Sequence, residues 1–373
     1  MSEELYKEFE PHQASDWAAQ VARDLKGKGS ASDFNWQLTD NQTINPFSIA
    51  ERPTFIPSET FDSWHIGEEI LVGNNILAAN QLLLEALASG ADAPQLVLEE
   101  DFNPNHLEAL LQNVLLEYIH VHFVYVATDA KNIVKLLQHF YDLLVKKNLP
   151  LRRVAGSFEL ALSAGDSLFL HPDLLFWTAE HLPSFRIVVL NGQPAHRGVA
   201  SASQELADVL KQGNDCLAHL TALGWKAKNV NQLFAFAMSV GTSYFVEIAK
   251  FRALRLLWGN LLAAYEVQNL DTLPPIYARF ATLSFDENEN TNRIRATTMA
   301  MSAVLGGADT LTVLPADKRG DTAFARRIAR NVQHLLKMES YLDRVKDPAS
   351  GSFYIEQLTE KLAEEAWAIF QKN

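Results

Sequence analysis

Short apolar runs and long helix-like segments alternate along the chain from about residue 61 to its end. The apolar runs have the length of β-strands and lie at 96–98, 122–126, 158–162, 187–190 and 310–313. A strand covered by helices on both faces is apolar throughout, whereas a strand with one wet face alternates. Because long helical patterns separate these runs, the sequence predicts parallel βαβ units.

Helical periodicity indicates about eight long helices, which we expect at 75–89, 105–118, 130–147, 203–223, 242–265, 291–305, 322–340 and 355–371. Asp129 and Ser201 stand where N-caps are expected, and Gly224 and Gly306-Gly307 stand where left-handed caps end helices. The number and length of these units favour an α/β fold, namely a (β/α)8 TIM barrel with an extended N-terminal arm. Periodicity cannot show that a sheet closes, so a doubly wound open sheet stays the alternative.

The first 60 residues differ from the rest because they are polar and rich in proline. We therefore divide the chain into an N-terminal arm, 1–60, and a barrel domain, 61–373. Trp17, Val21 and Leu25 recur four residues apart and predict a short helix over 16–25. The aromatic residues of the arm, among them Trp17, Trp36 and Phe47, need a surface to cover them. That surface belongs either to the chain's own barrel or to another chain.

Composition excludes several classes of protein. The chain has 32 Lys and Arg against 45 Asp and Glu, a net charge of −13, which excludes a general binder of nucleic acids or anionic membranes. A single cysteine, Cys216, excludes a disulfide framework and any cysteine-rich metal site. The polar N-terminus is no signal peptide, and no apolar run approaches the ~18–20 residues that span a bilayer. We therefore expect a cytoplasmic protein.

Common catalytic motifs are absent: we find no glycine-rich phosphate loop, no Gly-x-Ser-x-Gly and no His-Glu-x-x-His. Alternation on a strand would place His120 and His122 on one face, but without a third ligand we favour packing over metal binding. Glu159 would point into the barrel, where a buried carboxylate must be paired or protonated. The acidic run at 99–101 follows a strand, and we favour a solvated loop there.

A second group of residues has two interpretations each. Arg326, Arg327 and Arg330 share one helix near the expected barrel mouth, where they would hold a phosphate or form ion pairs, and we favour ion pairs. Cys216 lacks a basic neighbour in sequence and is interpreted as an apolar filler. His196-Arg197 lies in a loop after a strand, where barrel enzymes place catalytic groups.

Three blocks in the C-terminal third resemble the methylmalonyl-CoA mutase family. They are the segments 324–333, from Phe-Ala-Arg-Arg-Ile, and 345–356, from Val-Lys-Asp-Pro-Ala, together with 248–258, which contains Ala-Lys-Phe-Arg-Ala. The resemblance implies a TIM barrel that binds an acyl-CoA along its axis, followed in that family by a cobalamin-binding domain. The runs 311–317 and 196–201 are more similar to the small, beta subunit than to the catalytic subunit.

Residues that the resemblance makes catalytic are replaced in this chain. Gln193 and Pro194 stand where catalytic chains have Tyr and His, and proline offers no side-chain donor. The stretch 233–238, which includes Leu233 and Ala235 and has no cation, stands where catalytic chains carry an Arg and a Ser near the CoA. None of the 11 histidines has an Asp two positions before it, so the Asp-x-His-x-x-Gly cobalt ligand is missing as well.

The resemblance therefore implies a non-catalytic beta subunit that pairs, as a heterodimer, with a catalytic alpha subunit. We expect no catalytic, cofactor-binding or metal-binding residue in this chain, and adenosylcobalamin on the partner. Trp17, Trp36 and Phe47 would anchor the arm on that partner, and a homodimer is an option for the isolated chain. The alternatives are an acyl-CoA mutase barrel served by a separate cobalamin-binding chain, and a stand-alone barrel enzyme or acyl-CoA binding module. Whether the axis admits a CoA chain stays open.

Overall fold

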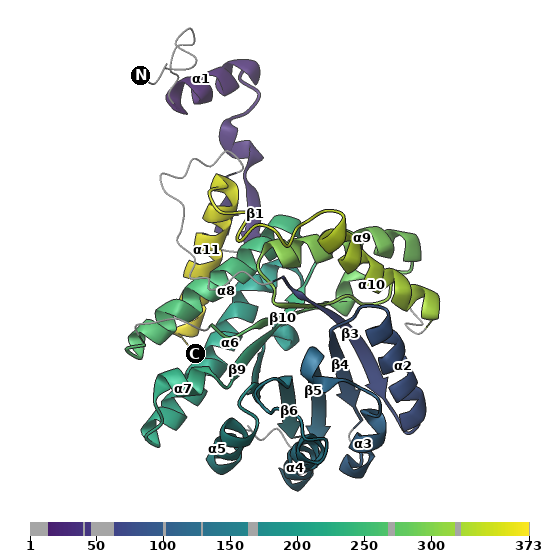
Figure 1. Ribbon diagram of the computed structural model, residues 1–373. Coiled ribbons are helices and arrows are strands. Elements are labelled where there is room, and N and C mark those ends of the chain that lie inside the picture. Colours follow the sequence, from purple (N-terminus) through teal and green to yellow (C-terminus); the bar gives the residue numbers. More distant parts are fainter. Residues whose placement is uncertain are drawn as a thin grey trace, which may run out of the picture.

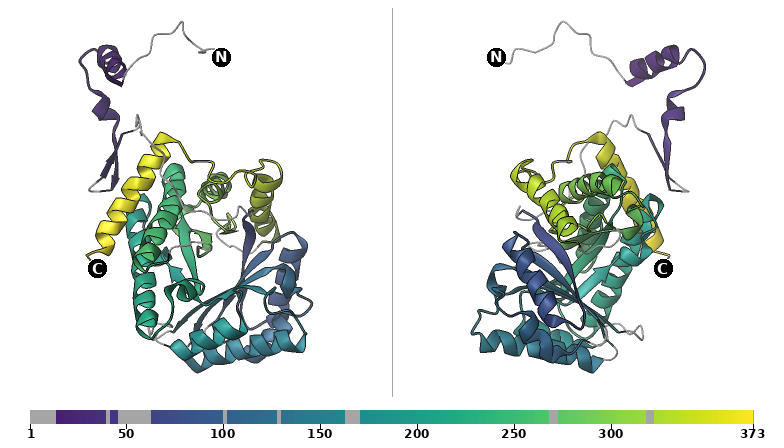
Figure 2. Two further views of the ribbon diagram at one scale, coloured as in Figure 1. Left: turned by 60° about the vertical axis from the view of Figure 1, so that its left-hand side comes forward. Right: turned by 90° about the vertical axis from the view of Figure 1, so that its right-hand side faces the viewer.

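A computed structural model gives the arrangement of the chain in Figure 1 and Figure 2. The structure describes residues 14–39, 42–45, 63–99, 102–127, 130–162, 171–267, 273–317 and 322–372. None of the helices within these ranges is long and apolar enough to cross a membrane.

The sheet of the barrel domain is made of parallel strands. They are β3 (His65–Val72), β4 (Ala93–Leu98), β5 (His120–Ala127), β6 (Ala155–Leu162), β7 (Phe185–Arg186), β8 (Val188–Asn191), β9 (Phe234–Val240), β10 (Ile276–Phe280) and β11 (Thr310–Thr312). Their order is β7-β6-β5-β4-β3-β11-β10-β9-β8.

The sheet closes because β7 and β8, its two ends, are halves of one strand. Only Ile187 separates them, and β7 pairs with β6 while β8 pairs with β9. At the break the amides of Ile187 and Val188 both donate to the carbonyl of Leu233, at 3.0 Å each, so two residues face one, as in a β-bulge. The ring therefore has eight strand positions, and the TIM-barrel prediction is confirmed over the open-sheet alternative.

Helices surround the barrel (Figure 1). They are α2 (Ile76–Ala88), α3 (Leu107–Leu110), α4 (Ala130–Lys146), α5 (Pro172–His181), α6 (Ala202–Ala222), α7 (Ala227–Asn231), α8 (Tyr244–Ala264), α9 (Glu289–Leu305), α10 (Ala323–Met338) and α11 (Phe353–Phe370). Seven of the eight expected helices are present to within two residues at each end. The helix expected at 105–118 is wrong, because α3 stops after one turn and Asn113 takes a left-handed φ of 62°.

The predicted helix caps have mixed outcomes. Gly224 and Gly307 each have a φ of 91°, as predicted, but Gly306 has a right-handed φ of −75°, which is not a left-handed cap. Ser201 occupies the N-cap position of α6 without capping it, since its hydroxyl donates to the carbonyl of Gly198 instead. Asp129 lies outside the described residues.

The N-terminal arm is fastened to the outside of α11. A helix, α1 (Ala14–Asp24), precedes a hairpin of β1 (Trp36–Thr39) and β2 (Gln42–Ile44). The indole of Trp36 donates to the hydroxyl of Tyr354 at 2.9 Å, and the ammonium of Lys361 donates to the carbonyl of Thr43 at 2.6 Å. The hairpin thus lies along α11, whereas α1 stands away from the barrel in both views of Figure 2. The division at residue 60 stays a prediction.

Candidate functional site

Two aromatic rings meet in the middle of the barrel. His122 comes from β5 and Tyr277 from β10, and their ring centroids lie 4.5 Å apart, in contact. Counted from β3, these strands hold the third and seventh of the eight positions, so they face each other across the axis. A contact between opposite strands has to pass through the axis, which these two side chains therefore fill.

A second polar layer lies closer to the carboxyl ends of the strands. Arg279 follows Tyr277 by two residues on β10, and its guanidinium pairs with Glu159 of β6 at 2.6 Å. The Asn191 amide donates to Glu159 at 2.7 Å, and Arg279 also donates to Gln193 at 3.2 Å. Glu159 therefore points into the barrel and is paired, as the sequence predicts for a buried carboxylate.

The titratable side chains in the barrel axis are either neutral or paired with an opposite charge. Burial, reinforced by His120 and Arg279, holds the pKa of His122 well below its ordinary value, and the ring bonds the hydroxyl of Ser157 at 2.9 Å. Burial raises the pKa of Tyr277 far above 10, and it raises the pKa of Glu69 while Arg279 opposes this in part. The axis is thus lined by a neutral imidazole, a neutral phenol and a compensated guanidinium.

The amino-terminal end of the barrel holds the remaining axial histidines. His65 and His120 stack with their centroids 3.9 Å apart, and His65 bonds Asp92 at 3.0 Å. Burial lowers the pKa of His120 to about 4. His120 and His122 share the inner face, as alternation predicts, but among the described residues no three His, Cys, Asp or Glu side chains are grouped to hold a metal ion.

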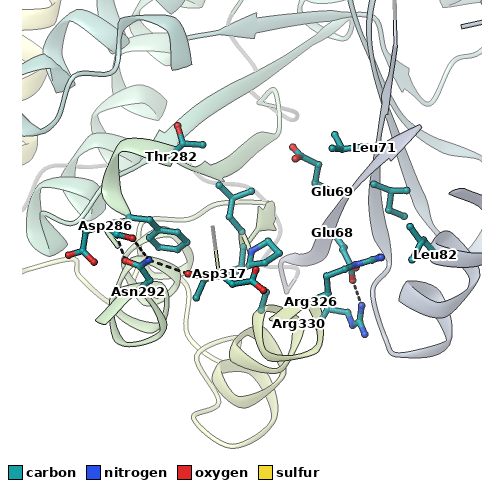
Figure 3. A pocket seen from close by; sticks show the side chains of 18 residues that line it. Glu68, Glu69, Leu71, Leu82, Thr282, Asp286, Asn292, Asp317, Arg326 and Arg330 are labelled. Atoms are coloured by element: carbon teal, nitrogen blue, oxygen red, sulfur yellow. Dashed lines mark hydrogen bonds and ion pairs between the residues drawn. The ribbon is translucent and has the colours of Figure 1, made fainter. Parts of the chain in front are cut away.

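A pocket of about 520 Å³ opens at the carboxyl-terminal mouth, between β3, the loops after β10 and β11, and α10 (Figure 3). At its lower edge Glu68 accepts from Arg326 at 2.7 Å and from Arg330 at 2.5 Å. All three side chains are buried. These two arginines therefore form the ion pairs that we favoured over phosphate binding. Arg327 is exposed, and its guanidinium lies 5.5 Å from the ring of Phe324.

The four replaced positions lie in two places. Gln193 and Pro194 form a turn after β8, where Gln193 is tied to Arg279 and the carbonyl of Pro194 accepts from Arg197 at 2.8 Å. Leu233 is the last residue of the loop before β9, and Ala235 lies within β9. Both side chains are buried. Three of these four side chains bring no hydrogen-bonding group to the barrel, and the fourth, Gln193, is bonded to Arg279 within the axial layer.

His196 belongs to a separate buried network beneath α6 and α8. It bonds Glu205 at 3.3 Å, and Lys250 pairs with Glu205 at 2.9 Å and with Glu247 at 2.8 Å. Burial alone would raise the pKa of Glu205, but Lys250, His196 and the Ser239 amide together hold it below its ordinary value. His196 is therefore a structural histidine, not a substitute for a catalytic one.

Other candidates from the sequence are resolved more simply. Cys216 is buried, and burial raises its pKa to about 12, as expected for an apolar filler. Glu99 is exposed after β4, as a solvated loop predicts, whereas residues 100 and 101 lie outside the described part of the chain.

Tyr277, Arg279 and Glu69 were not foreseen, because β10 and β3 carry polar residues and were not recognised as buried strands. Two signals could have found them: Tyr277 and Arg279, two residues apart in the otherwise apolar stretch 276–281, and the adjacent pair Glu68-Glu69 within 65–72.

The blocks that carry the family resemblance have structural roles. Arg252 on α8 pairs with Asp347 at 2.9 Å and with Glu356 at 2.8 Å, which joins the block at 248–258 to the block at 345–356. In the third block Gln333 donates to the carbonyl of Gly67, beside the Arg326 and Arg330 pairs. These residues fasten α8 to α11 and α10 to β3.

Comparison with known proteins agrees with these blocks. Residues 148–372 match the family model described as methylmalonyl-CoA mutase. The chain belongs to the methylmalonyl-CoA mutase family. It is 32% identical to a methylmalonyl-CoA mutase small subunit of Porphyromonas gingivalis, over 99% of this chain and 64% of that protein. A small subunit of Streptomyces virginiae is 29% identical over 94% of this chain and 60% of its own length.

A methylmalonyl-CoA mutase of Escherichia coli matches over only 55% of this chain, at 30% identity. The two relatives named above that match nearly the whole chain are both small subunits, and the predicted likeness to that subunit is confirmed. The chain spans less than two thirds of the length of these relatives. Among solved structures it is similar to a dihydropteroate synthase from Xanthomonas albilineans, with 14% identity, a TM-score of 0.38 and coverage of 75% of this chain and 95% of the other. Nothing about function follows from that level of similarity.

Proposed function

We propose that this chain is a non-catalytic small (beta) subunit that supports a catalytic alpha subunit in the cobalamin-dependent interconversion of methylmalonyl-CoA and succinyl-CoA. The observation that carries the proposal is the filled axis. An acyl-CoA that lies along a barrel needs an open path, and the His122–Tyr277 contact and the Arg279–Glu159 pair both cross it. The small-subunit relatives support the same role.

The residues of this chain do not fit adenosylcobalamin. A cobalt ligand must be an accessible imidazole, but His122 in the axis and His196 beside the replaced loop are buried and bonded to Ser157 and Glu205. No histidine follows an Asp by two positions. Radical chemistry also needs polar groups fixed on the substrate in a closed site. Gln193, which stands at the replaced position, is already bonded to Arg279. We therefore assign the cofactor to the partner.

The arm supports a role in assembly. An isolated helix of 11 residues is marginal in water, so α1 needs a surface to be stable. Trp17 on this helix is 42% exposed, which leaves apolar area for a partner, while Trp36 fastens the arm to α11. Phe47 lies outside the described residues. We infer that α1 contacts the alpha subunit and that the alpha–beta complex is a heterodimer.

We also propose that this chain acts in the cytoplasm, in propionate metabolism, because a single cysteine is typical of proteins in a reducing compartment. Fractionation of cells of the source organism tests this placement, and recovery with the membrane or secreted fraction would contradict it. The result bears only on the compartment, because the role as a subunit rests on the axis.

A reconstitution assay tests the function. The purified chain, the large mutase subunit from the same source and their mixture are each supplied with adenosylcobalamin and methylmalonyl-CoA, and succinyl-CoA is measured. We expect no turnover from the chain alone, and we expect the mixture to be more active or more stable than the large subunit alone.

Turnover by this chain with a separate cobalamin-binding protein, in the absence of a large subunit, would instead support the alternative of a catalytic barrel. The variant Trp17→Ala should weaken the complex with the large subunit without changing the thermal stability of the barrel. Failure of the mixture to associate would count against the role as a subunit.

A further inference from the structure

The outer face of α10 carries a regular apolar stripe. Phe324, Ile328, Asn331, Leu335 and Met338 follow one another at spacings of four, three, four and three residues. This is the a/d spacing of a helix that packs along another helix, and a single Asn within such a stripe commonly fixes register. The opposite face of α10, which includes Ala329 and Leu336, is buried against the barrel. The helix therefore has two apolar faces, only one of which the barrel covers.

The exposed stripe is large. Phe324 is 51% exposed, Leu335 56% and Met338 62%, and in the segment after the helix Tyr341 and Val345 are also exposed, at 59% and 58%. Single exposed apolar residues are ordinary, but a contiguous row of this kind marks a surface that another molecule covers.

Cationic side chains outnumber acidic ones around the stripe, although the chain as a whole has a net charge of −13. Arg327 is exposed beside Phe324, and the guanidinium of Arg293 also lies over that ring, at 5.7 Å. Arg344 is 70% exposed with its guanidinium 5.9 Å from the ring of Tyr341, and Lys346 is exposed as well. The acids beside these cations are Glu339, which is exposed, Asp343, which pairs with Arg344 at 3.5 Å, and Glu289, which pairs with Arg293 at 3.4 Å. A second copy of this chain would bring the same cations to the interface, so like charges disfavour self-association here.

We propose that the stripe on α10 docks an amphipathic helix of another chain, with an apolar seam and acidic flanks. Side chains at a 4-3-4-3 spacing would interdigitate with the partner's seam, as in helices that cross at about 20°. Carboxylates on the partner's flanks would meet Arg327 and the exposed guanidinium of Arg344. This surface lies on α10, whereas the N-terminal arm lies along α11. The proposed contact is therefore separate from the contact of the arm.

Binding of defined peptides tests the proposal on the full chain. Two labelled helical peptides share Leu at their a and d positions, one with Glu and the other with Lys at the flanking positions, and fluorescence anisotropy gives their affinities. We expect the acidic peptide to bind at least tenfold more tightly than the basic one, and its affinity to fall as salt rises. Leu335→Glu should lower the affinity for the acidic peptide about tenfold or more.

Val145→Glu is the matched control, since Val145 is 53% exposed on α4, away from the stripe. It should leave the affinity unchanged, and the melting temperatures of both variants should equal that of the parent. Equal binding of both peptides, or binding of neither, would overturn the proposal. So would a dimer of the chain alone, seen by sedimentation, that Leu335→Glu dissociates. None of these results bears on the role as a mutase subunit, because the peptides replace the partner.

Discussion

Replacing Arg279 with Met removes the only guanidinium that the axial layer places against Glu159 among the described residues. Both side chains are mostly buried, at 11% and 14% exposure, so the carboxylate cannot be rehydrated in place. Breaking a buried pair by removing one partner costs about 3–5 kcal/mol, because the other charge is left uncompensated. For a domain of this size that lowers the melting temperature by about 5–8 °C.

The loss should depend on pH through Glu69. Burial already raises the pKa of Glu69, and Arg279 is the group that opposes this. In Arg279→Met the pKa of Glu69 rises further. A carboxyl with a raised pKa in the folded state stabilises the fold below its unfolded pKa, and this stabilisation is lost as pH rises through the folded value. The variant should therefore be closer to the parent at pH 5 than at pH 7.

Thermal unfolding of four proteins at both pH values measures this. The double variant Arg279→Met/Glu159→Gln should recover much of the loss, since Gln still accepts from Asn191. Arg293→Met removes a surface pair with Glu289, which is 48% exposed, and should cost less than about 1 kcal/mol. A loss below about 1 kcal/mol in Arg279→Met, or one that is independent of pH, would refute the reasoning about the axis.

Three further predictions concern other parts of the barrel. Burial lowers the pKa of His120 to about 4, so its neutral form stabilises the fold fully above pH 6.5, and about 3 kcal/mol of unfolding free energy is lost as pH falls to 4. Denaturant titrations between pH 4 and pH 7 should show this loss. In His120→Gln the unfolding free energy should depend less on pH. Gly156→Ala should abolish soluble expression, because an added Cβ would lie 1.8 Å from the carbonyl oxygen of Val121; normal folding of this variant would contradict the packing. Cys216 should resist thiol reagents at pH 8 until the protein unfolds, since burial raises its pKa to about 12; rapid labelling of the native chain would show that the thiol is accessible.

The sequence predicted the barrel because its helices are long and most strands are solidly apolar. It missed β3 and β10, since both carry charged side chains within the strand, and it also missed β9, although that strand is apolar apart from Ser239 and is buried along its whole length. Glu159 was placed correctly because Phe158 and Leu160 define an outer face on either side of it. Its partner Arg279 lies 120 residues away on a strand that had not been recognised, so no local pattern could pair them.

The arm shows the same limit. Its polar, proline-containing sequence marks it as distinct, but the Trp36–Tyr354 hydrogen bond joins residues 318 apart in the chain. Only the fold brings α11 beside the hairpin. The exposed stripe on α10 was equally hidden, because a helix pattern alone does not tell which apolar residues face the barrel.

The most direct test of the account is a calorimetric titration of the purified chain with succinyl-CoA. With the barrel axis filled by His122, Tyr277, Arg279 and Glu159, the account predicts no heat of binding up to millimolar ligand. Stoichiometric binding, with a crystal structure that places the pantetheine chain along the axis, would contradict it.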